Sequence, residues 1–454
     1  MDIFGNIFYF ILVIGALITI HELGHFLAAK LTKMRAEIFC IGMGPRILGW
    51  NKKTKFTFGK LDDNLELDGD TDYRLAAFPI GGYVKIAGMV DESMDTDFIN
   101  SPPKDYEFRS KGSFAKILVM SAGAIMNFIL AIIIFSFISF TEGKTELAVT
   151  VVGSIDSKTV AEKIGFQAND KIISINNQEV KSWNDIVYGL TLKDFGKELN
   201  VEVMRQGQKQ NLKYNGNELV KLFASKMPLG LNPGGIEVYV ENAVKGRPAE
   251  KAGIKPGDRI TAVNSIEINT QYKLQETLKI LKNQDVTVQW LRNGQTMQSN
   301  IFIGNDGLLG IQLRFAPLTK IDYTLMESVK FGFVETVDKT VFIVSSIGQM
   351  FKGNVSFNES IAGPVMIFDM TSKQAKEGFA SLLNFMALLS ISLGFLNILP
   401  LPALDGGHIA ILLIEGIFRR ELPTKAKLYI QQAGIILIIL LSVYVIINDV
   451  TKFF

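Results

Sequence analysis

Residues 16–30 read ALITIHELGHFLAAK, which places two histidines and a glutamate inside an apolar run. Positions four apart lie on one face of a helix, so His21 and His25 can present two imidazole nitrogens to one ion, with Glu22 beside them. Such groups are costly in lipid unless they pair or bind something. The HExxH pattern therefore predicts a zinc-hydrolase type of metal site, in preference to an apolar stripe whose histidines only form hydrogen bonds.

The composition describes a chain that lies partly in lipid and partly in water. Its 454 residues are 48% hydrophobic and 20% charged, with a mean hydropathy of +0.24. The net charge of +2 and the lack of a basic run interleaved with aromatics argue against nucleic-acid binding. A single cysteine, Cys40, excludes an intramolecular disulfide.

Four apolar segments are long enough to cross a bilayer. The first has no basic residue ahead of it, so we expect a retained helix and not a cleaved signal peptide. Basic residues follow the first span and lie between the third and fourth, which places both loops in the cytoplasm and residues 140–378 outside. The predicted spans are 6–29, 115–138, 379–400 and 428–447.

An internal repeat occupies the long outer segment. Residues 160–180 read VAEKIGFQANDKIISINNQEV and residues 248–268 read PAEKAGIKPGDRITAVNSIEI, and the two align without a gap. Each predicts a short helix, a turn closed by an aspartate, a strand, and a second turn that contains asparagine. The paired residues are Asp170 and Asp258 in the first turn and Asn176 and Asn264 in the second.

This repeat resembles the core of bacterial PDZ domains, which implies two tandem PDZ-like α/β domains over 142–226 and 228–316. PDZ domains bind an extended peptide as an added strand. Neither repeat has an obvious carboxylate-binding loop, so a steric filter without a bound peptide remains an alternative.

Asp405 is the best candidate for the third protein ligand that a catalytic zinc needs. It lies in NILPLPALDGGH (397–408), just past the third span. The two prolines interrupt the helix, and Gly406 and Gly407 let the backbone turn without a Cβ penalty. An acidic residue at a broken membrane helix is costly unless it meets a cation. His408 is a possible ligand, but a supporting or turn-stabilising role is the better interpretation.

Taken together, these motifs and AGAIMNF (122–128) resemble the site-2 protease family of intramembrane zinc metalloproteases, in its regulator of sigma-E branch. The resemblance covers nearly the whole chain. It implies that His21, His25 and Asp405 bind Zn²⁺ and that Glu22 activates water. It also implies substrate contacts from Asn397 and from a membrane-associated β-hairpin in FPIGGYVKIAGM (78–89). The hairpin residues are Gly81, Gly82, Tyr83, Val84 and Lys85. Ala124 departs from the family, which usually has proline there.

The resulting fold class is a polytopic α-helical membrane protein with four transmembrane helices, a membrane-associated β-hairpin and two tandem extracytoplasmic PDZ-like domains. The predicted segments are a first helix with HExxH (1–35), a β-rich cytoplasmic-side loop (36–113), a second helix (114–140), the two PDZ-like domains (142–226 and 228–316), an amphipathic juxtamembrane segment (318–376), a third helix with the LDG motif (377–410) and a fourth helix (427–449).

The resemblance implies a protease of the inner membrane of a Gram-negative bacterium, acting in the envelope stress response. Its expected partners are the lipid bilayer and a single-span membrane protein already cut outside, such as an anti-sigma factor, or signal-peptide remnants. A non-enzymatic PDZ scaffold with a structural metal is one alternative, and Glu22 discriminates between them because such a site needs no base. A metal transporter is disfavoured because no inverted repeat of spans is present.

Overall fold

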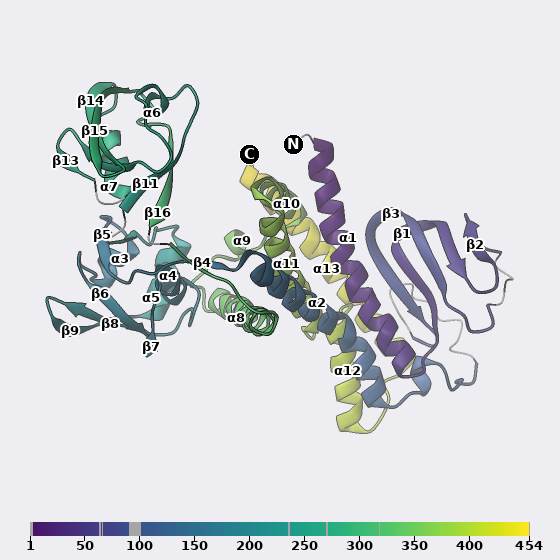
Figure 1. Ribbon diagram of the computed structural model, residues 1–454. Helices are drawn as coiled ribbons and strands as arrows, with labels where there is room; N and C mark the ends of the chain where they lie inside the picture. The colour runs from purple at the N-terminus through teal and green to yellow at the C-terminus, as the bar shows by residue number, and fades with distance from the viewer. Residues whose placement is uncertain are drawn as a thin grey trace. The chain divides into compact units, whose positions relative to one another are not determined.

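The computed structural model describes residues 3–62, 65, 67–89, 101–234, 237–268, 271–316 and 318–453, which form two compact units (Figure 1). The membrane unit contains the described residues of Met1–Glu142, Tyr323–Ile343 and Phe357–Phe454. The inserted unit contains those of Gly143–Asp322 and Val344–Ser356.

Four helices of the membrane unit are long and apolar enough to cross a bilayer, which confirms the four predicted spans. A helix of about 30 residues is about 45 Å long, so α2 exceeds the roughly 30 Å hydrocarbon layer and must tilt or project beyond it. The helices are α1 (Ile3–Leu31), α2 (Ser113–Glu142), α11 (Phe379–Ile398) and α13 (Thr424–Phe453).

Small residues bring α1, α2 and α11 together. A Cβ on Gly24 of α1 would lie 2.9 Å from the backbone nitrogen of Gly123, and one on Gly394 of α11 would lie 3.1 Å from the carbonyl oxygen of Ala124. Ala131 and Ile391 are fully buried between α2 and α11. These contacts bring the HExxH helix, the AGAIMNF segment of α2 and the helix that precedes the LDG motif next to one another.

The predicted third segment, 377–410, contains the break expected at its prolines, but a second helix follows it. Helix α11 ends at Ile398, and a separate helix, α12 (Asp405–Phe418), begins at Asp405. Pro400 and Pro402 explain the break, since each removes a backbone donor and clashes with the preceding turn of a helix.

The predicted amphipathic juxtamembrane segment, 318–376, contains one strand and three helices. Strand β17 (Leu318–Ile321) comes first, followed by α8 (Leu325–Phe351), α9 (Phe357–Ser360) and α10 (Pro364–Glu377). Gly363 and Pro364 start α10, where proline is tolerated because the first helical amide needs no partner.

The β-rich loop after α1 forms a three-stranded sheet, so the predicted hairpin was incomplete. The strands are β1 (Ala36–Asn51), β2 (Lys55–Phe58) and β3 (Asp72–Ile86), in the order β2-β1-β3, and a short 3₁₀ helix, η2 (Phe108–Ser110), follows. The Gly82–Ile86 end of β3 lies at the edge of the sheet, whereas Tyr73–Leu75 pair with β1 on both sides. Val84 and Ile86 at its end pack with Phe26 of α1, which holds this edge against the first membrane helix.

The first half of the inserted unit has its own core. A four-stranded sheet in the order β7-β6-β8-β9 and a two-stranded sheet of β10 and β5 surround buried apolar side chains such as Val160, Ile172 and Ile186. Its strands are β4 (Lys144–Leu147), β5 (Val152–Ile155), β6 (Lys171–Ile175), β7 (Gln178–Glu179), β8 (Leu199–Arg205), β9 (Gln208–Tyr214) and β10 (Leu231–Pro233). Its helices are α3 (Val160–Ile164), α4 (Trp183–Thr191) and α5 (Gly216–Ala224).

The second half has a separate core around Ile260, Leu274 and Trp290. Five of its strands follow one another in the order β15-β14-β12-β11-β16, with β13 paired to β12. Its strands are β11 (Glu237–Ala243), β12 (Arg259–Val263), β13 (Ile266–Glu267), β14 (Gln284–Arg292), β15 (Gln295–Ile303) and β16 (Ile311–Ala316), and its helices are α6 (Pro248–Lys251) and α7 (Gln271–Ile280).

The repeated aspartates each close a turn in the same way. Asp170 accepts hydrogen bonds from the amide of Gln167 (2.8 Å) and from Arg205 (2.7 Å). Asp258 likewise accepts from the amide of Lys255 (2.7 Å) and from Arg292 (2.7 Å). Each arginine also donates to a glycine carbonyl, that of Gly165 (2.8 Å) or Gly253 (2.6 Å). The two halves therefore share a side-chain network as well as a sequence pattern.

The main segment of the inserted unit, Gly143–Asp322, begins and ends on paired strands. Strand β4 is antiparallel to β17, with Leu147 opposite Leu318 and Lys144 opposite Ile321. The chain thus leaves and rejoins the helical sequence along one two-stranded ribbon.

Candidate active site

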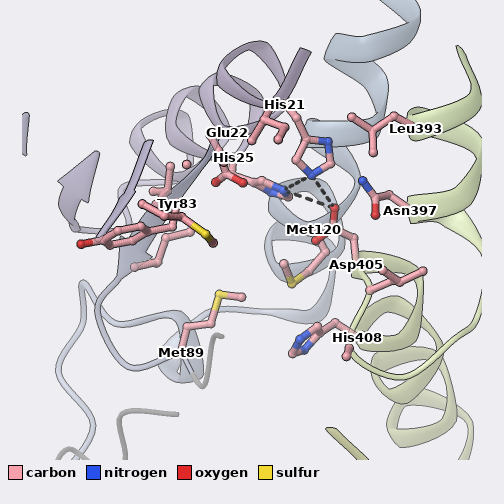
Figure 2. A pocket seen from close by; sticks show the side chains of 18 of the residues that line it. His21, Glu22, His25, Tyr83, Met89, Met120, Leu393, Asn397, Asp405 and His408 are labelled. Atoms are coloured by element: carbon pink, nitrogen blue, oxygen red, sulfur yellow. Dashed lines mark hydrogen bonds and ion pairs between the residues drawn. The ribbon is translucent and has the colours of Figure 1, made fainter. Parts of the chain in front are cut away.

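Two side chains of α1 and one from the start of α12 converge in the membrane unit. The Nε2 atoms of His21 and His25 lie 3.2 Å apart. Oδ2 of Asp405 lies 3.1 Å from the first nitrogen and 3.3 Å from the second. Figure 2 shows the three groups pointing to one spot. Both histidines are buried, at 8% and 6% exposure, so water screens this cluster little.

The break between α11 and α12 delivers Asp405 to this cluster. Ala403 has a positive φ of 71°, an unusual conformation for a residue with a Cβ, and it lies in the turn just before α12. Glycine is not needed at 406 and 407 for the predicted reason, a backbone turn that a Cβ would hinder, because neither residue has a positive φ. A Cβ on either would instead overlap a backbone carbonyl of the preceding loop, that of Leu399 or Leu401.

The donor set fits a zinc ion. Nδ1 of His25 lies 2.8 Å from the carbonyl oxygen of Val119, which can only accept, so Nδ1 carries the proton and Nε2 presents a lone pair. Oδ2 of Asp405 is buried without a hydrogen-bond partner within the described residues. The lone pair on Nε2 of His25 and the negative Oδ2 of Asp405 repel each other at 3.3 Å, and a cation bound by both atoms removes this repulsion. Ligand atoms about 2.0–2.1 Å from a tetrahedral Zn²⁺ lie roughly 3.3 Å apart, close to the three separations observed.

The cluster opens into a cavity of about 570 Å³. Glu22 lines it next to the histidines, and Asn397 lines it from the last turn of α11 (Figure 2). Most of the predicted strand reaches the cavity as well, namely Gly81, Gly82, Tyr83 and Val84. The cavity therefore joins the ligand cluster, a carboxylate beside it and the edge strand of the sheet.

Lys85 and His408 were both predicted near the site, and the structure gives each a partner outside the ligand cluster. Lys85 is absent from the cavity lining among the described residues, and its Nζ lies 3.9 Å from a carboxylate oxygen of Glu37. His408 lines the cavity, and its Nε2 lies 2.8 Å from the amide nitrogen of Gln431 on α13. This contact connects α12 to α13, and a supporting role for His408 stays a prediction.

Sequence reasoning missed several residues that shape the cavity. Gly123 faces the two histidines from α2, and the AGAIMNF motif (122–128) that contains it has no predicted role at the metal site. Met43, Met89 and Met120 line the cavity walls. Methionine is flexible and apolar, so these walls can adapt to side chains of different shapes.

The sequence also matches a known protein family and several named proteins. Residues 9–441 match peptidase family M50. The chain belongs to peptidase family M50, the site-2 proteases. It is 28% identical to the regulator of sigma-E protease RseP of Escherichia coli over 98% of both chains, and 27% identical to the regulator of sigma E protease of Haemophilus influenzae over 97% of both. A Neisseria meningitidis protein provisionally named as a zinc metalloprotease is 31% identical over 98% of both chains.

This member of family M50 is accordingly a zinc metalloprotease and an integral membrane protein. The relatives are matched along almost their whole length, so the resemblance includes the repeats and the sheet as well as the HExxH helix.

Proposed function

We propose that this M50 protease hydrolyses a peptide bond within the transmembrane segment of a single-span protein, with His21, His25 and Asp405 as its zinc ligands. The observation that carries the proposal is the convergence of these three side chains at a cavity that also holds Glu22 and the edge of β3.

Glu22 is the general base of this proposal. When bound, Zn²⁺ supplies a Lewis acid and lowers the pKa of a water molecule to about 7. Glu22 follows His21 on α1, and its side chain lines the cavity beside the ligands, within reach of a water held there. Its carboxylate takes the proton from this water and returns it to the leaving amine.

The edge of β3 receives the substrate backbone. A helical substrate hides its amides in internal hydrogen bonds and must unwind before cleavage, and the freed groups need partners in lipid. In the described register, Gly82–Lys85 pair with Ile38–Ile41 of β1. Because β3 ends the sheet order, an unwound segment can add to it as a further strand, with Asn397 facing it across the cavity.

The substrate class follows from the family and the inserted unit. We infer a single-span protein of the anti-sigma factor type that an earlier external cut has shortened, with the PDZ-like halves excluding the intact form. The protease would lie in the inner membrane, with these halves in the periplasm and the active site toward the cytoplasm.

Replacing Glu22 tests the proposal directly. Purified wild type should cleave a single-span reporter and contain zinc, whereas Glu22→Gln should retain zinc and lose cleavage by a factor of about 10² or more. Equal cleavage by the two proteins would overturn the role of Glu22, and a protein without zinc would overturn the ligand set.

Unwinding has a separate test in the substrate. A reporter span that contains Gly or Pro should be cleaved faster than an all-Leu span of equal length, because its helix opens at lower cost. Equal rates would show that unwinding is not required.

A deletion can test whether the PDZ-like halves exclude intact substrate. Leu147 lies opposite Leu318, so an Asn-Gly turn can replace residues 148–317 and keep the β4–β17 ribbon. The shortened protease should cleave a substrate with its full external domain. Continued protection of that substrate would contradict a filter.

A further inference from the structure

The rear nitrogen of His21 faces a side chain that has no assigned role. Nδ1 of His21 lies 3.2 Å from the side-chain amide nitrogen of Asn127, on α2. Asn127 is fully buried, and its Oδ1 has no hydrogen-bond partner among the described residues. Only one end of this buried amide therefore has a partner, and which end faces His21 decides which tautomer of His21 the contact supports.

The two histidines are supported unequally. Nδ1 of His25 lies 2.8 Å from the carbonyl of Val119, and a carbonyl fixes the proton on Nδ1. For His21 to present Nε2 as a lone pair, its Nδ1 must also carry a proton and donate it. An amide nitrogen at 3.2 Å cannot accept that proton, because it is itself a donor.

Rotating the amide resolves this conflict. The oxygen and nitrogen of an asparagine side chain are nearly identical in shape, so a half turn exchanges them without moving neighbouring atoms. Oδ1 then occupies the position 3.2 Å from Nδ1 and accepts its proton. The orientation with nitrogen toward His21 suits the other tautomer, in which Nε2–H donates to Asp405 and cannot bind a metal.

We propose that Asn127 is a positioning residue whose Oδ1 accepts the Nδ1–H of His21 and thereby holds His21 in the tautomer that binds zinc. This inference rests on the proposed ligand set and adds to it a helix that supplies no ligand. It makes α2 responsible for both rear contacts, through the Val119 backbone and the Asn127 side chain.

The backbone around Asn127 is held independently of its side chain. Oγ of Ser390 on α11 donates to the carbonyl oxygen of Asn127, at 2.8 Å. Neighbouring packing between α2 and α11 includes Ala131 and Ile391, both fully buried. A substitution of the amide can therefore be compared with one that disturbs only this helix contact.

The test is the zinc affinity of the full-length protein in detergent, measured by competition with a coloured chelator. Asn127→Leu, which leaves Nδ1–H unpaired, should bind zinc about 10–100-fold more weakly than wild type. Asn127→Asp keeps only acceptors and should bind at least as tightly as wild type. Ser390→Ala is the matched control and should keep the wild-type affinity.

Two further measurements keep the outcomes distinct. Gel filtration and the thermal midpoint of the zinc-free proteins show whether Asn127→Leu folds, and Asn127→Ser serves as a smaller variant if it does not. Co²⁺-loaded Asn127→Asp should shift the visible absorption bands, because a carboxylate partner makes the imidazole a stronger ligand.

The failure of this inference differs from that of the proposed site. If wild type binds no zinc, the ligand set is wrong. If wild type binds zinc and Asn127→Leu or Asn127→Ser binds it equally well, the site stands and Asn127 has no positioning role. Weak binding by Asn127→Asp and Asn127→Leu alike would also overturn it, since the acceptor would then not matter.

Discussion

A Cβ atom on Gly123 would lie 2.5 Å from Nε2 of His25. It would also lie 2.7 Å from Nε2 of His21. Real Cβ contacts are essentially never shorter than 3.0 Å, so α2 approaches the two imidazoles as closely as a residue without a side chain allows. The ligand cluster is therefore bounded by backbone on the α2 side.

Gly123→Ala should displace the histidines and lower zinc affinity at least tenfold, because ligand geometry must hold to within about 0.5 Å. Chelator competition and zinc content after dialysis measure this. Gly416→Ala on α12 is the matched control, since its Cβ would meet nothing within 4 Å. Unchanged zinc affinity in Gly123→Ala would show that the helices separate easily.

Removing zinc should lower the thermal stability of the wild-type protein and leave Asp405→Ala almost unaffected. Ligand binding stabilises the folded state by about 2.7 kcal/mol at a concentration 100 times the Kd. Thermal unfolding in detergent, with chelator and then with added Zn²⁺, checks this. A similar zinc response in Asp405→Ala would show that Asp405 is not a ligand of the ion.

Asp449 should contribute to stability through the start of α10. It is fully buried and accepts hydrogen bonds from the amides of Gly363 (3.0 Å) and Met366 (2.9 Å). Asp449→Ala leaves both amides without this acceptor and should cost about 1–3 kcal/mol of unfolding free energy. Asp449→Asn keeps one oxygen and should cost less. Equal thermal midpoints for Asp449→Ala and wild type would contradict the capping role.

The paired aspartate–arginine networks should each stabilise one half of the inserted unit. The Asp170 side chain is completely buried, and Arg205 donates to both of its oxygens and to the carbonyl of Gly165, a set of hydrogen bonds that lysine cannot reproduce. Arg205→Lys should therefore speed hydrogen exchange in β6 and β8. Lys197→Ala, which removes an exposed ion pair with Asp194, should change it little. Arg292→Lys should act on β12 and β14 in the same way, and exchange equal to that of wild type would refute the prediction.

The spans and the repeat could be predicted because each is encoded locally. A run of about 20 apolar residues is sufficient to identify a membrane helix. The repeated turns are visible because aspartate and asparagine recur at fixed offsets, and Asn176 and Asn264 do adopt the positive φ that favours asparagine. Their arginine partners lie more than 30 residues away, so no local pattern pointed to Arg205 or Arg292.

Some residues of the candidate site could likewise be predicted from a local motif, and others could not. HExxH and the LDG motif single out their residues by chemistry, but the roles of Gly123 and Asn127 depend on which helix each one faces. Helix α12 was not predicted because its 14 residues are too few to qualify as a membrane span. The third strand of the sheet escaped because Lys55–Phe58 is too short to show a period.

The ribbon of β4 and β17 has a consequence for how this lineage can diversify. An inserted domain whose first and last residues lie side by side can be duplicated, deleted or replaced, because the two points where it joins the rest of the chain stay adjacent whatever its size. Two repeats with matching side-chain networks are the trace such a duplication leaves. Relatives with a different number of repeats could therefore keep the same hydrolytic core while admitting a different range of client proteins.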